Sequence, residues 1–132
     1  MAYGHHSRLG LFQQAALVTL EVENAADLQQ VLTDNALYRD GVSGARRVLK
    51  ALALAARQLH DTGFYHKDLK LRNILLRWKN DEPELFFFDC PSGHYPPKFM
   101  LHRCIVRDLA HLEEGLRGYV RRVDLLYMFR VY

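Results

Sequence analysis

The sequence predicts an α+β fold that is mostly helical, and three stretches of apolar spacing carry that prediction. Residues 48–59 follow helical spacing, residues 74–88 hold two short apolar runs joined by a polar turn, and residues 109–132 return to helical spacing. With 132 residues, 49% of them apolar and 25% charged, the chain has the size and composition of one globular domain or part of one. This composition excludes bulk disorder.

A strand and a short helix are expected before the longest helix. Ala15–Val22 is short and β-branched, and acidic residues alternate at its end, which predicts a strand. Asn24 is the expected cap of a short helix over Ala25–Leu32. Residues 1–10 are polar and show no periodicity, so a frayed start is expected there.

The clearest helix is expected between a polar interval and a glycine. Its apolar residues recur along one face, at Val48, Leu49, Leu52, Ala55, Ala56 and Leu59. Ser43 can cap the start of this helix, and Gly63 can adopt the left-handed conformation that ends it. Because the apolar face is continuous, the helix is expected to pack on the core.

A strand, a turn and a second strand follow this helix. Ile74–Leu76 and Leu85–Phe88 are apolar runs, and Asn80–Pro83 between them has the composition of a turn. The prolines between residues 91 and 97 cannot continue a sheet, so a loop is expected there.

The C-terminal part of the chain is expected to form two helices. The apolar residues of the first recur at helical spacing, at Leu109, Leu112, Leu116 and Tyr119. Asp108 precedes them and is expected in the first turn of that helix. The second helix is expected over Asp124–Tyr132.

Charge and cysteine content exclude several classes of protein. The chain has 18 Lys and Arg residues against 15 Asp and Glu, a net charge of +3, and its interspersed charges are no nucleic-acid signature. Two cysteines cannot build a disulfide framework. No apolar run is long enough for a membrane-spanning helix and no secretory signal is visible, so a cytoplasmic protein is expected.

Most histidines and arginines are expected to be structural or solvated. The histidines lack metal-ligand spacing and are expected to be surface or capping groups, at His60, His94, His102 and His111. Five arginines are expected on solvated faces, with a surface for anionic lipid as the alternative, at Arg46, Arg47, Arg117, Arg121 and Arg122.

The polar loop between the long helix and the hairpin holds the residues with recognisable chemistry. His66, Asp68, Lys70 and Asn73 lie close together in the sequence, and Asp89 follows at the end of the second hairpin strand. Phosphoryl transfer from ATP needs a carboxylate beside the acceptor hydroxyl, a cation near the migrating group and oxygen ligands for magnesium. Asp68 and Lys70 fit the first two roles, and Asn73 with Asp89 fits the third. The hairpin is expected to return Asp89 to the loop.

These residues resemble the catalytic loop of protein-kinase-like folds. The loop reads His66-Lys-Asp-Leu-Lys-Leu-Arg-Asn73, and Asp89-Cys-Pro91 stands where the metal-binding acid is expected. The resemblance is closer to the bacterial lipopolysaccharide kinases, which phosphorylate Kdo or heptose sugars of the inner core. It rests further on Arg107–Leu112 and Arg122–Phe129 and spans Leu17 to Tyr132.

The resemblance implies a fold and a role for each polar residue. Residues 17–132 would be the large, C-terminal lobe of a kinase with its hinge strand and a small catalytic hairpin, and residues 1–16 would be a frayed remnant, with the small lobe largely missing. Asp68 would be the catalytic carboxylate, and Lys70 would be the phosphate-facing cation. Asn73 and Asp89 would be metal ligands, with His66 and Asp108 supporting the site. Glu21 and Val22 would make backbone contacts to adenine.

The implied activity is an ATP- and Mg²⁺-dependent phosphotransfer to a hydroxyl, and the acceptor implied first is a lipid-linked lipopolysaccharide core sugar. The chain has no Gly-rich loop and no Lys-bearing strand before Leu17, so a truncated fragment is one interpretation. The alternatives are an inactive kinase-like binding module, or a kinase acting on protein Ser/Thr or on a small-molecule hydroxyl. The expected place is the cytoplasm, with peripheral contact at the inner face of an anionic membrane.

Overall fold

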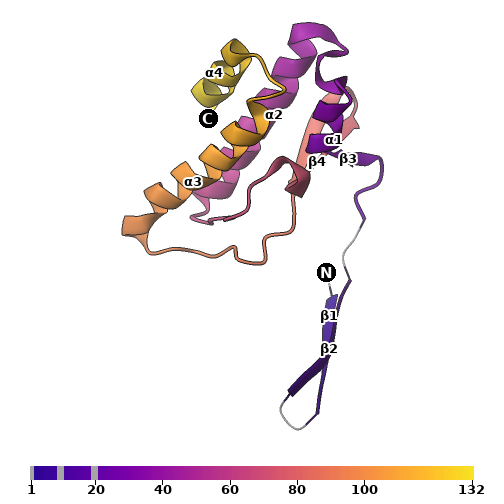
Figure 1. Ribbon diagram of the computed structural model, residues 1–132, viewed down its shortest axis with the longest axis vertical. Coiled ribbons are helices and arrows are strands. Elements are labelled where there is room, and N and C mark those ends of the chain that lie inside the picture. The colour runs from indigo at the N-terminus through magenta and orange to yellow at the C-terminus, as the bar shows by residue number, and fades with distance from the viewer. Residues whose placement is uncertain (1, 9–10, 19–20) are drawn as a thin grey trace.

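The computed structural model describes residues 2–8, 11–18 and 21–132, and it is a mostly helical body with a small antiparallel sheet (Figure 1). The sheet has the strand order β3 (Ala25–Asp27), β4 (Ile74–Lys79), β5 (Glu82–Phe87), and the long helix α2 (Gly41–Asp61) packs against β5. The α+β prediction is therefore confirmed. Within the described residues, no helix has the length and apolar character needed to cross a membrane.

A separate two-stranded hairpin begins the chain. Strand β1 (Ala2–Arg8) pairs antiparallel with β2 (Leu11–Val18). The frayed start expected over residues 1–10 is wrong for β1, because this segment has a pairing partner that its own composition does not reveal. The strand expected over Ala15–Val22 begins earlier and ends at Val18. Residues 19–20 lie outside the described residues, and residues 21–22 belong to no strand.

The short helix begins later than the sequence suggests. Ala25–Asp27 forms strand β3, whose backbone pairs with β4, so these residues are not available to a helix. Helix α1 (Leu28–Thr33) starts after Asp27, whose Oδ1 accepts a hydrogen bond of 2.8 Å from the Gln30 backbone N–H. The cap is therefore Asp27, and the expectation of Asn24 is wrong. A single 3₁₀ turn, η1 (Ala36–Tyr38), follows.

Helix α2 (Gly41–Asp61) is the central element of the core. Its apolar face is buried as expected, and it packs against α4 and β5. Gly63 ends the helix with a φ of +83°, which confirms the left-handed position. Ser43 lies inside the helix and is not its cap, because the helix begins after Asp40.

The expected hairpin is confirmed, with longer strands. Strand β4 (Ile74–Lys79) pairs with β5 (Glu82–Phe87) in a register that places Ile74 opposite Phe87. Asn80 and Asp81 both have positive φ, of 51° and 63°, as a two-residue hairpin turn requires.

Two helices complete the fold, as expected. Helix α3 (Lys98–Leu116) starts directly after the proline loop, so Asp108 lies in its middle and not in its first turn. The early part of this helix is mostly exposed, although Leu101, Cys104 and Ile105 extend the helical spacing of Leu109 and Leu112 toward its start. Helix α4 (Arg122–Val131) matches the expected C-terminal helix and lies near α2 at the upper end of the view in Figure 1.

A buried ion pair joins α4 to the start of α2. The side chain of Asp124 is fully buried, and its oxygens lie 2.8 Å from Arg46 Nε and 2.6 Å from Arg121 Nε. The Tyr38 hydroxyl donates a third hydrogen bond of 3.0 Å. Hydrogen bonds from Arg121, then Arg46 and Tyr38, lower the pKa of Asp124 to about 2. Arg46 and Arg121 therefore hold a buried carboxylate and are not simply solvated charges.

Candidate active site

The polar loop of residues 66–73 is held by alternating buried and exposed side chains. Leu69 and Leu71 are buried and anchor the loop, whereas Lys70 and Arg72, which follow them in turn, are exposed. The loop ends in one 3₁₀ turn, η2 (Leu71–Asn73), closed by a 2.9 Å hydrogen bond from the Asn73 backbone N–H to the Lys70 carbonyl. The apolar anchors thus fix the backbone and leave Lys70 and Arg72 directed outward from the core.

Three of the residues singled out by the sequence are in direct contact. Lys70 Nζ lies 2.6 Å from Asp68 Oδ1. Asn73 Nδ2 donates to the Asp68 carbonyl at 2.9 Å and to Asp68 Oδ2 at 3.0 Å. The hydrogen bond from Lys70 lowers the pKa of Asp68, so the carboxylate is ionised at neutral pH. The loop therefore presents an oriented carboxylate beside a cation.

Asp89 is brought to this loop by the hairpin. The Phe88 backbone N–H donates a 3.1 Å hydrogen bond to the Asn73 carbonyl, so Asp89 is the next residue after that contact. Its φ is +53°, where the chain leaves the sheet. Burial lowers the pKa of His66, and the carboxylates of Asp108, Asp68 and Asp89 oppose that shift.

Asp108 contacts the backbone of the loop from the middle of α3. Its carboxylate accepts hydrogen bonds from the His66 backbone N–H at 2.9 Å and from the Lys67 backbone N–H at 3.0 Å. Lys67 has a φ of +71°, a left-handed conformation that is unfavourable for a side chain of this size. The fully buried carboxylate holds this turn in place.

His60, which the sequence predicts to be a surface or capping group, connects Asp108 to Tyr132. His60 is buried, with Nε2 at 3.3 Å from Asp108 Oδ2 and Nδ1 at 2.8 Å from the Tyr132 hydroxyl. The expectation of a surface or capping role for His60 is therefore wrong. A signal was present in the sequence, because His60 follows Ala56 at the helical spacing of the buried face.

The side chain of His66, the first residue of the loop, is packed in the interior. Its ring is buried, neither ring nitrogen has a hydrogen-bond partner, and it meets the edge of Phe87 at a centroid distance of 6.3 Å. Because burial is the largest effect and lowers its pKa, His66 is neutral at pH 7. A neutral packed ring fits the supporting position that the sequence suggests for this residue.

The donor set fits a magnesium ion held partly by a nucleotide. Both hydrogens of the Asn73 amide nitrogen go to Asp68, which leaves the amide oxygen for a cation. Asp89 adds an exposed carboxylate at the next residue after the backbone contact of Phe88 with Asn73. Over the described residues, no three His, Cys, Asp or Glu side chains gather into a protein-only metal cage. Mg²⁺ bound through one or two protein oxygens plus phosphates needs no such cage.

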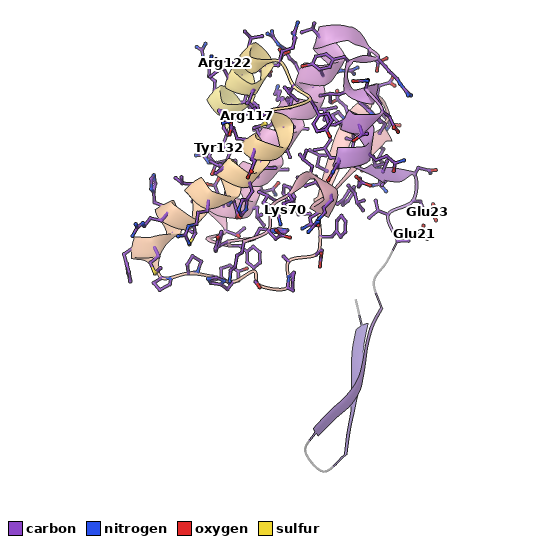
Figure 2. The ribbon with its side chains drawn as sticks, in the orientation of Figure 1. Glu21, Glu23, Lys70, Arg117, Arg122 and Tyr132 are labelled. Atoms are coloured by element: carbon purple, nitrogen blue, oxygen red, sulfur yellow. The ribbon has the colours of Figure 1, made fainter. Side chains whose placement is uncertain are left out.

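The hinge residues lie apart from the loop. In Figure 2, Lys70 lies in the middle of the body, whereas Glu21 and Glu23 lie at its edge near β3. Glu21 is exposed, and no hydrogen bond joins it or Val22 to the loop. Their backbone contact with adenine stays a prediction.

A solved structure resembles this fold, and curated proteins resemble this sequence. The structure described as "WaaP in complex with acyl carrier protein" superposes with a TM-score of 0.77 at 24% identity, over 98% of this chain and 56% of that one. This likeness concerns the fold. A 3-deoxy-D-manno-octulosonic acid kinase of Haemophilus influenzae (strain PittGG) is 32% identical over 121 residues, 91% of this chain and 46% of the relative. A probable serine/threonine-protein kinase 2 of Plasmodium falciparum is 30% identical over 83 residues, 61% of this chain and 16% of the relative.

The chain has the fold of the WaaP structure, and its polar loop holds Asp68 in contact with Asn73. The sequence model of the "Lipopolysaccharide kinase (Kdo/WaaP) family" matches residues 1–132, so the chain belongs to that family. The resemblance seen in the sequence is thereby confirmed. The chain spans about half the length of the Haemophilus kinase and of the WaaP chain that it matches.

Proposed function

We propose that this chain is part of a kinase that transfers the γ-phosphoryl group of ATP, with Mg²⁺, to a hydroxyl of a lipopolysaccharide core sugar. The observation that carries the proposal is the contact of Asp68 with both Lys70 and Asn73. Membership of the lipopolysaccharide kinase family supports a kinase, and the named activity of the Haemophilus relative favours a sugar acceptor.

Each residue of the loop has a proposed task in this reaction. The ionised carboxylate of Asp68 accepts a hydrogen bond from the acceptor hydroxyl and orients its oxygen toward the phosphorus. Lys70 offsets the negative charge that gathers between Asp68 and the migrating group. Asn73 and Asp89 provide the oxygen ligands for the Mg²⁺ that ATP carries. His66 and Asp108 hold the loop, and Glu21 and Val22 offer backbone groups to adenine.

The proposal also includes peripheral contact with an anionic membrane, which would bring the loop to a lipid-linked acceptor. The segment 90–107 contains no Asp or Glu, and its cations are Lys98, Arg103 and Arg107. Beside them, Phe99 is 84% exposed and Tyr95 is 70% exposed. Exposed aromatic groups among cations favour an anionic lipid surface.

The experiment on the phosphotransfer is a comparison of two carboxylate variants of the 132-residue chain. Transfer from ATP to a Kdo-bearing lipid A precursor is measured with Mg²⁺ for wild type, Asp68→Asn and Asp61→Asn. The loss expected for Asp68→Asn is about 10²–10⁴-fold, the range for a positioned acid–base group. Asp61 forms an exposed ion pair on α2, and its variant is expected to keep wild-type activity.

The alternative function, a nucleotide-binding module without catalysis, gives a different result. Stabilisation of the wild-type chain by ATP and Mg²⁺ together with an absence of transfer to any hydroxyl would favour it over the kinase. Equal turnover by Asp68→Asn and wild type would show that Asp68 has been given the wrong role.

The experiment on the membrane contact uses sedimentation with vesicles. Phosphatidylglycerol-containing vesicles are expected to retain the wild-type chain, and phosphatidylcholine vesicles to retain little of it. Phe99→Ser is expected to lower the retained fraction. Leu126→Ser, at an exposed apolar residue on a different helix, α4, is expected to leave it unchanged. Retention that does not depend on lipid charge or on Phe99 would contradict a lipid contact at this segment.

A further inference from the structure

A cavity of about 290 Å³ lies between the candidate catalytic loop and the second half of α3. Its polar lining comes from α1, the loop, α3 and the turn after α3, at Gln29, Lys70, Arg72, His111, Glu114 and Tyr119. This volume is near the lower end of the range for small-molecule sites, so it suits one sugar ring and not an extended peptide.

The cavity shares a residue with the candidate active site. Lys70, whose Nζ is 2.6 Å from Asp68 Oδ1, forms part of its wall. A molecule in the cavity therefore lies next to the group proposed to orient the acceptor hydroxyl. A second cavity, bounded by Arg117 and Arg122 among others, has no such contact with the loop. In Figure 2 these two arginines lie toward α4, away from Lys70.

Arg72 is the cation in this wall that is best placed for an anion from outside. Lys70 is already paired with Asp68, whereas Arg72 NH2 is 3.9 Å from Asp68 Oδ2, at the limit of an ion pair. The Arg72 side chain is 62% exposed. A guanidinium in this state has N–H groups available to bind a carboxylate or a phosphate with two parallel hydrogen bonds.

His111 supplies a second polar group without a partner. Its Nδ1 is buried and makes no hydrogen bond to the described part of the chain. A polar atom that is removed from water in this way is stabilised by any ligand oxygen or hydroxyl that reaches it. Because His111 lines the cavity, a rotation of its ring that exposes Nδ1 would let a bound sugar supply that partner.

The remaining groups of the lining suit hydroxyls. The Glu114 carboxylate accepts hydrogen bonds, the Gln29 amide both donates and accepts, and the Tyr119 hydroxyl does the same. Glu114 also repels an anion, so the charged group of a ligand belongs on the Arg72 side and its hydroxyls on the Glu114 side. The lining therefore selects a molecule with several hydroxyls and one anionic group.

We infer that this cavity is the acceptor subsite and that Arg72 selects a sugar bearing a carboxylate or phosphate. The inference rests on the proposed kinase function and adds to it the place and the charge of the acceptor. Arg72 acts here as a specificity-determining residue, and His111 as a hydrogen-bonding partner of the sugar.

The experiment is a binding titration of the 132-residue chain followed by NMR. The probes are 3-deoxy-D-manno-octulosonic acid, mannose 6-phosphate and neutral mannose. Both anionic sugars, or one of them, are expected to shift the Gly115 amide and the His111 ring, and mannose is expected to bind at least about tenfold more weakly. The stronger of the two anionic probes shows whether the subsite takes a carboxylate or a phosphate.

Variants separate this inference from the proposed reaction. Arg72→Gln is expected to weaken anionic-sugar binding by about 10–100-fold, the loss expected for a charge-assisted hydrogen bond. Arg117→Gln, at an arginine of the second cavity that is paired with Glu113, is expected to bind as wild type does. Asp68→Asn is expected to lose transfer while it still binds the anionic sugars more tightly than mannose.

Two results would overturn the inference. One is equal affinity of Arg72→Gln and wild type for the anionic sugars. The other is that the sugars shift only NMR signals of residues around the second cavity, at Arg117. Either result leaves the proposed reaction standing if transfer still depends on Asp68. If the wild-type chain transfers no phosphate but its sugar binding still depends on Arg72, the result would instead count against the kinase function.

Discussion

Replacement of Asp108 by asparagine tests whether one buried carboxylate holds the candidate catalytic loop. In the native chain this carboxylate accepts hydrogen bonds from the His66 and Lys67 backbone N–H groups at 2.9 and 3.0 Å. Asparagine keeps one acceptor oxygen and puts an NH₂ group in place of the other. One backbone N–H is then left buried without a partner, and both hydrogen bonds lose the contribution of a charged acceptor.

The expected loss of stability follows from these contacts. An unsatisfied buried donor costs about 1–3 kcal/mol, and a charged acceptor adds roughly 1 kcal/mol to a hydrogen bond. Relaxation of the left-handed conformation at Lys67 offsets part of this loss. We therefore expect Asp108→Asn to lower the free energy of unfolding by about 2–4 kcal/mol.

The assay is urea unfolding of the 132-residue chain followed by circular dichroism. The midpoint is expected to fall while the slope with urea concentration stays unchanged, because the surface exposed on unfolding is the same. Asp61→Asn is the matched control, since this carboxylate is 64% exposed and paired with Arg57 on the same helix, and its effect is expected within about 0.5 kcal/mol. An effect of Asp108→Asn as small as that of the control would refute the reasoning.

Three further predictions concern other contacts of the fold. Gly115→Ala places a Cβ 2.9 Å from Leu71 Cγ and is expected to destabilise the chain by about 1–2 kcal/mol in urea, whereas Gly118→Ala, with nothing within 4 Å, is expected to change little; equal effects would contradict the packing argument. Asp81→Gly is expected to raise the free energy of unfolding by about 0.5 kcal/mol, and with it the thermal midpoint, because glycine adopts the turn's φ of 63° without strain. A lower midpoint would count against this. The lowered pKa of Asp124 adds stability that is complete above its ordinary value of 3.8 and is lost as the pH falls toward about 2, so the advantage of wild type over Asp124→Asn in acid unfolding should shrink across that interval; an advantage independent of pH would be incompatible with it.

Contacts between neighbours in the sequence were the most predictable part of the fold. The hairpin follows from two apolar runs and the Asn80–Asp81 turn, and the turn forms from those two residues themselves. The buried face of α2 and its end at Gly63 follow from helical spacing and glycine's freedom at positive φ. These features depend on interactions within a few residues, so a sequence pattern is enough to reveal them.

The errors occur where a distant partner decides the local structure. Ala25–Asp27 is a strand because β4 pairs with it, although its own residues suit a helix. Helix α3 begins at Lys98, so Asp108 lies in its middle, where the carboxylate accepts hydrogen bonds from the distant polar loop. His60 was expected on the surface, yet its partner Asp108 lies on another helix.

The order of residues in the polar loop, by itself, determined which groups could take part in phosphoryl transfer and which family the chain resembles. The tertiary structure decided how that loop is held and what lies beside it: a buried carboxylate from α3 under the turn, and a cavity between the loop and the same helix. The physical reason is that a sequence pattern records side-chain chemistry and local spacing. A buried acceptor and the shape of a cavity arise only when elements distant in the chain pack together.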